Sequence, residues 1–164
     1  MKLSVVIPNY NGIMYLEKCL AALDKQDFTD YDIIVVDDAS TVEGIEETVK
    51  AYPKAKFIKH SENRGFAASV NDGIKASDAE YIFLLNNDAY VDDGCLSTLI
   101  KDMDEEGPST FSIQCKMLSA FNHALIDNAG DFYNIPYNVS MLKIFTLVPT
   151  VVWHRFLAPL LVAN

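Results

Sequence analysis

Three polar residues that follow an apolar segment give the sharpest indication of chemistry in this sequence. Asn86, Asn87 and Asp88 come directly after the apolar run Tyr81–Leu85. Proteins usually hold Mg²⁺ with one or two carboxylates together with phosphate oxygens of the substrate. One well-placed aspartate is therefore enough for a metal site if a diphosphate supplies other ligands. The structural alternative is an ordinary turn, because Asn and Asp are common turn residues.

A second polar segment, from Pro8 to Gly12, follows the apolar run Leu3–Ile7. Its Asn11-Gly12 pair is typical of a tight turn with positive φ. Tyr10 offers a flat face on which a nucleobase could stack. A plain loop between a strand and a helix is the alternative interpretation.

A third segment places two acids after the apolar run Ile33–Val36. One carboxylate of Asp37 and Asp38 could accept a hydrogen bond from a base N–H or a ribose hydroxyl. Ser40 and Glu43 fit a capping box, which predicts a helix beginning at Ser40. The alternative for the acids is solvation in a loop, with favourable contact to the N-terminus of that helix.

A fourth segment, which follows the run Lys56–Lys59, contains a basic residue. Arg64 could meet a phosphate, or it could pair with Glu62 at the surface. Two polar residues of the next predicted helix, Asn71 and Asp72, could face a nucleotide or solvent. For Asp72 the structural role is favoured.

These segments are separated by alternating strand and helix patterns. Continuous apolar runs predict strands, and apolar residues at i, i+3, i+4 and i+7 predict helices. The predicted strands are 3–7, 33–36, 56–59, 81–85 and 111–117, and the predicted helices are 14–23, 40–52, 66–76 and one capped by Asp92 or Asp93. Strands that are apolar throughout and alternate with helices indicate an α/β fold with a mainly parallel sheet covered on both faces. Such sheets bind ligands beyond the carboxyl ends of their strands.

Composition limits the class of protein. The chain has 164 residues, half of them apolar, and a net charge of −10, which argues against a nucleic-acid partner. Cys19, Cys95 and Cys115 are widely separated, so they predict buried core residues rather than a zinc site or a disulfide framework. These features favour a cytoplasmic protein. The first apolar run, which Pro8 ends, is too short for a signal peptide.

Taken in order, the four polar segments resemble those of family 2 glycosyltransferases, which have the GT-A fold. The matching sequences are Ser4–Gly12, Val35–Ser40, Glu62–Ala67 and Leu84–Ala89, and Ile126–Gly130 resembles the segment that follows the metal motif in that family. Within the family, the segments look most like those of rhamnosyltransferase-like members. The resemblance covers about residues 3 to 130.

The resemblance implies a role for each matched residue. The implied substrate contacts are Pro8, Tyr10, Asp38, Arg64, Asn71 and Asn86, and the implied metal ligand is Asp88. Asp38 would bond the base, and Asp88 would hold Mg²⁺ or Mn²⁺. The implied reaction is transfer of a sugar, with inversion, from a nucleoside diphosphate sugar (UDP- or dTDP-linked) to a hydroxyl of a glycan or lipid-linked acceptor.

The end of the chain departs from the family pattern. In the family, the general base lies in a later acidic motif, but here no acidic residue follows Asp131. The general base expected of an inverting enzyme is therefore absent, and the catalytic residue stays unassigned. We therefore expect a donor-binding domain over residues 1–131, resembling a family member truncated after its donor-binding half. Residues 132–164 form an apolar tail. The tail predicts either peripheral membrane contact at the inner face of the cell membrane, through interfacial helices, or a truncated acceptor-side segment.

Three other functions are weighed against transfer. A non-catalytic fragment that binds a nucleotide sugar would also explain the missing base. A receiver-type signalling domain is suggested by Asp37 and Asp38, but in receivers the acidic pair follows the first strand rather than the second. A dinucleotide-binding dehydrogenase is weaker still, because no G-x-G-x-x-G follows any predicted strand.

Overall fold

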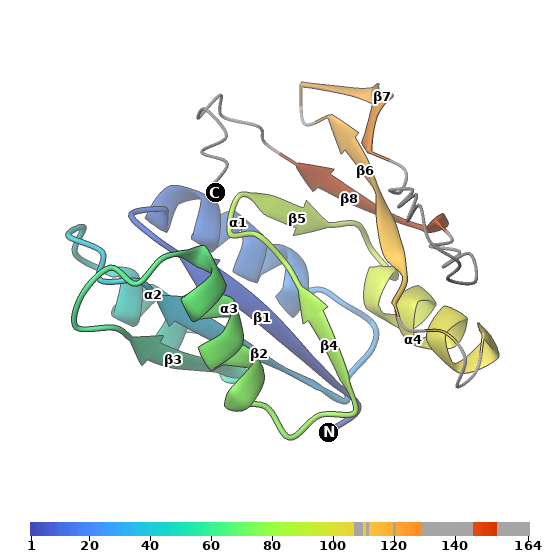
Figure 1. Cartoon of the computed structure of the whole chain (residues 1–164). Helices are drawn as coiled ribbons and strands as arrows, with labels where there is room; N and C mark the ends of the chain where they lie inside the picture. The colour runs from blue at the N-terminus through green and yellow to red at the C-terminus, as the bar shows by residue number, and fades with distance from the viewer. Residues whose placement is uncertain (107–109, 111, 120, 129–145, 154–164) are drawn as a thin grey trace, which may run out of the picture.

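The computed structural model of the chain describes residues 1–106, 110, 112–119, 121–128 and 146–153 (Figure 1). Strands and helices alternate along the first half of the chain, as the sequence predicts. The elements are β1 (Leu3–Asn9), α1 (Ile13–Asp24), β2 (Tyr31–Asp37), α2 (Ile45–Lys50), β3 (Ala55–Lys59), α3 (Phe66–Lys75), β4 (Tyr81–Leu84), β5 (Ala89–Val91), α4 (Cys95–Glu106), β6 (Gln114–Ser119), β7 (Asn122–Asn128) and β8 (Thr146–Trp153).

The main sheet has four strands in the order β3-β2-β1-β4, and every neighbouring pair is parallel. In this order the chain runs outward from β1 to β2 and β3, and then returns to place β4 on the other side of β1. Because the strands are parallel, the carboxyl ends of β1, β2 and β4 lie at one edge, and the order reverses at β1. The predicted α/β fold with a parallel sheet is confirmed.

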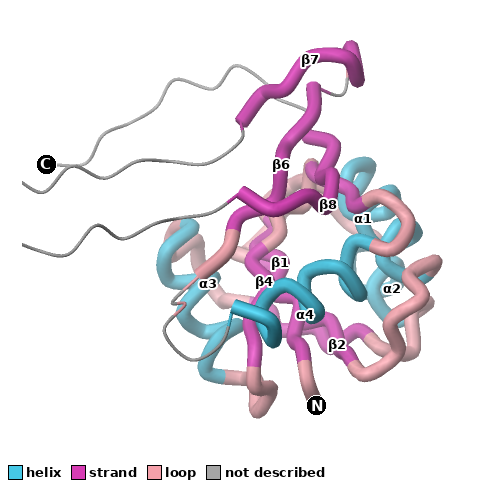
Figure 2. Tube along the Cα trace, turned by 90° about the vertical axis from the view of Figure 1, so that its right-hand side faces the viewer, coloured by secondary structure: helices cyan, strands magenta, loops and turns pink. Residues whose placement is uncertain are grey.

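Alternate residues of the two central strands fill two separate cores. One face contributes Val5, Ile7, Ile33 and Val35 to the larger core, which also contains apolar residues of α1, α2 and α4. The other face contributes Val6, Ile34 and Val36, and α3 lies against it. Figure 2 shows α3 on one side of the strands and α1 and α2 on the other. Helices therefore cover both faces, as predicted.

Helix α3 approaches the sheet closely at Gly73. A Cβ atom there would lie 2.4 Å from Cγ1 of Val6 and 3.2 Å from Cγ2 of Val36. Only a residue without a side chain fits at this distance. This contact sets the position of the helix that begins beside the strand ends.

A second, mixed sheet has the order β5-β8-β6-β7. The short strand β5 was not expected from the sequence. The last predicted strand, 111–117, is shifted to Gln114–Ser119, and residue 111 lies outside the described residues. Thr146–Trp153, assigned to the tail, forms β8 and pairs with β5 and β6. These residues form a strand, whereas the predicted membrane contact through interfacial helices would need a helix. The boundary at residue 131 stays a prediction, and the rest of the tail lies outside the described residues.

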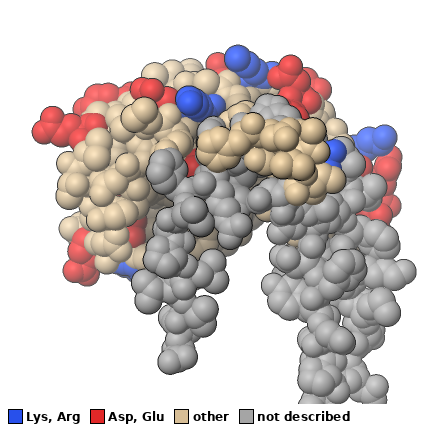
Figure 3. Space-filling model, turned by 90° about the horizontal axis from the view of Figure 1, so that it is seen from above, with Lys and Arg blue, Asp and Glu red and all other residues tan. Residues whose placement is uncertain are grey.

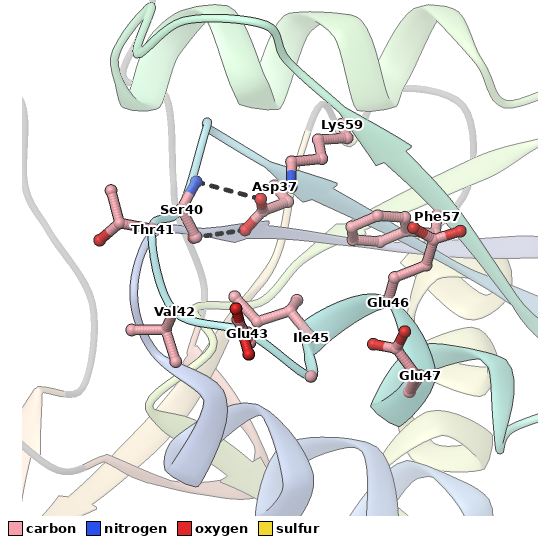
Figure 4. A pocket seen from close by; sticks show the side chains of 11 residues that line it. Asp37, Ser40, Thr41, Val42, Glu43, Ile45, Glu46, Glu47, Phe57 and Lys59 are labelled. Carbon is pink, nitrogen blue, oxygen red and sulfur yellow. Dashed lines mark hydrogen bonds between the residues drawn. The ribbon is translucent and has the colours of Figure 1, made fainter.

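The predicted capping box at Ser40 is wrong. Helix α2 begins at Ile45, after Gly44, whose φ is 87°, and no side chain caps it. Ser40 instead bonds back to the preceding strand: its hydroxyl donates to Oδ1 of Asp37 at 2.5 Å, and its N–H donates to Oδ2 at 3.1 Å (Figure 4). The two bonds keep Ser40 in the loop.

The predicted aspartate cap of the fourth helix is also wrong. Helix α4 begins at Cys95, and the N–H of Leu96 donates to Oε1 of Gln26 at 3.1 Å. The Gln26 side chain is buried and also donates to the carbonyl of Asp92 at 2.9 Å. A residue from the end of α1 therefore caps this helix.

The three cysteines are free and buried, as predicted. Among the described residues, no helix is long and apolar enough to cross a membrane. On the face shown in Figure 3, the acidic and basic side chains of the described residues lie interspersed, without a basic patch.

Candidate functional site

A hollow of about 410 Å³ lies at the edge where the strands of the main sheet end. Its walls come from the ends of β1 and β2, the start of α3 and the segment after β4. The lining residues are Pro8, Asn9, Tyr10, Asp38, Asn63, Gly65, Phe66, Ser69, Asn86 and Asn87. Four of the residues implied by the resemblance thus meet in one hollow: Pro8, Tyr10, Asp38 and Asn86.

A chain of side-chain hydrogen bonds joins three strand ends beneath this hollow. The Asn87 amide donates to Oδ1 of Asn9 at 2.7 Å. The Asn9 amide donates in turn to Oδ1 of Asp37 at 2.8 Å. Asn9 and Asp37 are buried. The bonds hold the segment after β4 in a fixed position relative to β1 and β2. Sequence reasoning assigned Asn9 no role of its own, although its place at a strand end was a usable signal.

Gly12 is required by this chain of bonds. A Cβ atom at Gly12 would lie 2.1 Å from Nδ2 of Asn87 and 3.1 Å from Oδ1 of Asn9. The φ of Gly12 is −108°, so the requirement is steric and not conformational. Asn11, directly before it, has a φ of 53°, which asparagine tolerates better than most residues.

Asp38 is held by three donors. It is only 4% exposed. Its Oδ1 accepts the N–H of Arg64 at 2.8 Å and contacts Nδ1 of His60 at 2.7 Å, and its Oδ2 accepts the N–H of Gly65 at 2.8 Å. Burial pushes the pKa of Asp38 up, but the two backbone N–H groups and His60 outweigh it and hold the pKa below its ordinary value. An ionised carboxylate has about four acceptor sites, so one site on Oδ2 is left for a ligand.

Two of the implied substrate contacts do not line the hollow. The Arg64 guanidinium contacts Oδ2 of Asp72 at 2.6 Å, so the predicted pairing with Glu62 is replaced by one with α3. Asn71 is exposed on α3. Asp72 also accepts from Lys75 at 3.2 Å, which agrees with the structural role predicted for it.

Two exposed aromatic rings stand among the lining residues. Tyr10 is 53% exposed and Phe66 is 63% exposed. Aromatic faces of this kind bind flat apolar groups such as nucleobases. Phe66 was predicted only as the start of a helix. Its place directly after Gly65, at the edge where ligands bind, was the available signal for a binding role.

Asp88 lies in the turn between β4 and β5, next to the lining residue Asn87. Among the described residues, no group of three or more His, Cys, Asp and Glu could hold a metal ion. A metal that takes one carboxylate from the protein and its other ligands from a diphosphate needs no such group.

A larger hollow of about 620 Å³ lies beside α2 (Figure 4). Its lining includes four acids, Asp37, Glu43, Glu46 and Glu47, and one base, Lys59. Lys59 is the register partner of Asp37. This lining repels an anion, since like charges at close range disfavour binding. The smaller hollow at Asp38 is therefore the candidate site for a phosphate-bearing ligand.

Comparison with known proteins agrees with this arrangement. The model of the family described as glycosyl transferase family 2 matches residues 4–155. The chain belongs to this family. The family resemblance drawn from the four motifs is thereby confirmed, and the receiver-domain alternative is set aside.

Two relatives illustrate the similarity. The GalNAc(5)-diNAcBac-PP-undecaprenol beta-1,3-glucosyltransferase of Campylobacter jejuni is 32% identical over 108 residues, which are 63% of this chain and 35% of that protein. The poly(ribitol-phosphate) beta-N-acetylglucosaminyltransferase TarS of Staphylococcus aureus is 30% identical over 122 residues, which are 71% of this chain and 21% of that protein. This family 2 chain thus matches about a third or less of each relative's length.

A solved structure supports the fold. The structure of Staphylococcus aureus TarS 1–349 in complex with UDP-GlcNAc matches with a TM-score of 0.65 and 28% identity, over 73% of this chain and 35% of that one. The finer likeness to rhamnosyltransferase-like members stays a prediction.

Proposed function

We propose that this chain forms the donor-binding part of an inverting glycosyltransferase that takes its sugar from a UDP- or dTDP-linked donor. The observation that carries the proposal is the hollow itself. It combines the Tyr10 ring, the one remaining acceptor site of Asp38 and the segment that leads to Asp88. The match to a structure that contains UDP-GlcNAc supports a donor of this class.

Each part of such a donor has a matching group. The single acceptor site left on Asp38 suits the one imide N–H of uracil or thymine. The Tyr10 ring would stack on the base, and Pro8 would border it. The diphosphate would then extend toward Asn86 and Asp88, across the end of β1.

A divalent metal, Mg²⁺ or Mn²⁺, would be held by Asp88 and the diphosphate, and when bound it supplies charge stabilisation for the leaving group. The residues of this chain do the rest: they bind the base, orient the diphosphate and fix the turn through the Asn87–Asn9 bond. Asn71, on α3, and Arg64, two residues before α3, lie outside the hollow.

The general base is not among the residues that line the hollow. Asp38 is the acid that lines the hollow, and its three donors occupy most of its acceptor sites. A base would therefore come from elsewhere, or the chain binds the donor without transferring it. Relatives whose names include undecaprenol and poly(ribitol-phosphate) support a lipid-linked or glycan acceptor, with residues 1–131 as the donor domain in the cytoplasm, at the inner membrane face.

Thermal unfolding with added nucleotides tests the donor site. UDP or dTDP at a hundred times its Kd, with Mn²⁺, should raise the Tm by roughly 5–10 °C, because binding at that level contributes about 2.7 kcal/mol. Asp88→Ala should lose the metal-dependent part of the shift. Asp93→Ala, which removes an exposed carboxylate five residues away, is the matched control and should keep it.

The outcomes separate the candidate functions. No shift with any nucleoside diphosphate would rule out the donor site, and an equal shift in Asp88→Ala would remove Asp88 from the metal role. A shift without transfer to added acceptors or donor hydrolysis would favour the non-catalytic binding fragment.

A further inference from the structure

His60 is a buried residue that the proposed function leaves without a role. It follows β3 directly and is 7% exposed. Its Nδ1 lies 2.7 Å from Oδ1 of Asp38, which directly follows β2. Its Nε2 lies 3.3 Å from Oδ2 of Asp72, on α3. The ring therefore stands between the acid that lines the hollow and the helix beside it.

The two ring nitrogens are not equally satisfied. Nδ1 has to carry a proton, because the ionised Asp38 oxygen it meets can only accept. Nε2 is buried and, among the described residues, has no hydrogen-bond partner, since its 3.3 Å approach to Asp72 is not aligned for one. A bare Nε2 would turn a lone pair toward a carboxylate, which costs free energy in a buried place. A protonated Nε2 attracts Asp72 instead.

Two basic side chains also contact the Asp72 carboxylate that His60 approaches. Arg64 contacts the same Oδ2 of Asp72 at 2.6 Å, and Lys75 contacts Oδ1 at 3.2 Å. Lys59 precedes His60 along the chain. The basic groups reach Asp72 from the solvent side, whereas His60 reaches it from inside.

We propose that His60 is a positioning residue for the nucleobase contact at Asp38. Its Nδ1–H orients the carboxylate so that the remaining acceptor site of Oδ2 faces the hollow. Its Nε2 lies 3.3 Å from Oδ2 of Asp72, so the ring stands between that carboxylate and α3. The inference rests on the proposed function, because it concerns the acid that would bind the base.

Calorimetric titration of UDP with Mn²⁺ tests the proposal. His60→Asn places an amide N–H at the Nδ1 position, so binding should stay within about two-fold of the natural chain. His60→Gln moves the amide to the Nε2 position, leaves Oδ1 short of a donor and should weaken binding about ten-fold or more.

Asp72→Asn keeps the test decisive if a His60 variant fails to fold. Its side chain has the same shape and can accept from a protonated Nε2 or donate to a bare one, so UDP binding should stay within about two-fold of the natural chain. Asp72→Ala removes the group that Nε2 meets and should weaken binding. Unfolding curves without nucleotide identify any variant that is merely destabilised.

The proposal is overturned if His60→Gln binds UDP as tightly as the natural chain, or if His60→Asn binds it as weakly as His60→Gln. Where the His60 variants do not fold, Asp72→Ala that binds as tightly as the natural chain overturns it. Any of these results leaves the proposed donor site standing if Asp38→Asn abolishes UDP binding. If the natural chain itself binds no UDP, the donor site and the role of His60 both fall.

Discussion

Replacement of Gly12 by alanine tests whether side chains or backbone hold the candidate metal segment in place. The new Cβ would lie 2.1 Å from Nδ2 of Asn87, and Cβ contacts under 3.0 Å essentially do not occur. The Asn87 amide would therefore have to move by about 1 Å or more. The movement breaks its 2.7 Å bond to Asn9 and displaces the neighbouring Asp88.

The cost follows from three contributions. Loss of the Asn87–Asn9 bond costs about 1 kcal/mol, and overpacking at this contact costs about 1–3 kcal/mol. Alanine also restricts the unfolded chain, which offsets about 0.4–1 kcal/mol. We expect Gly12→Ala to lower the free energy of unfolding by about 1–3 kcal/mol.

A double-mutant cycle with Asn87→Ala isolates the contact. In the Asn87→Ala background the clashing Nδ2 is gone, so Gly12→Ala should cost less than about 1 kcal/mol and the coupling should be about 1–2 kcal/mol. Urea unfolding followed by circular dichroism measures all four chains. UDP and Mn²⁺ binding should weaken in Gly12→Ala, because the segment that leads to Asp88 has moved.

Two results would refute this reasoning. A neutral or stabilising Gly12→Ala would mean that the backbone around residues 86–88 gives way without cost. Equal costs in both backgrounds would mean that the Asn87 amide is not the atom that excludes a side chain at Gly12.

Two further predictions concern the scaffold. Gly73→Ala should lower the free energy of unfolding by about 1–3 kcal/mol in urea, because its Cβ would lie 2.4 Å from Val6, and Val6→Ala should recover part of the loss; a cost unchanged by Val6→Ala would contradict this. The lowered pKa of Asp38 contributes stability that is fully present above the unfolded-state value of about 4 and is lost as pH falls through the folded-state pKa. Urea unfolding from pH 6 to pH 3 should therefore show a smaller loss in Asp38→Asn than in the natural chain, and parallel curves would show that Asp38 makes no such contribution.

The fold could be predicted from the sequence because its signals are local. The apolar runs that became β1 and β2 contain β-branched residues on both faces, which only a sheet covered on both sides can bury. The rule that ligands bind beyond strand ends then brought Pro8, Tyr10, Asp38 and Asn86 to one edge, where the hollow lies.

Features that depend on distant residues could not be predicted. Gln26 caps a helix 70 residues away, and Asn9 bonds Asn87 across 78 residues. Arg64 matches a phosphate-binding pattern, but its guanidinium pairs with the carboxylate of Asp72 on α3. Ser40 fits a capping box, but Asp37 offers two acceptors before the helix can begin. In each case a partner that local patterns do not reveal decides the outcome.

The strand order also sets a length. Asp38 follows β2 and Asn86 follows β4, and the single strand β1 lies between those two strands. Neighbouring strands lie about 4.8 Å apart, so the two strand ends are separated by roughly 10 Å. A ligand that meets Asp38 at one end and the segment before Asp88 at the other must span that interval. The sheet thus selects ligands by length as well as by chemistry: a free base or an isolated phosphate contacts one end only, whereas a base joined through a ribose to a diphosphate reaches both.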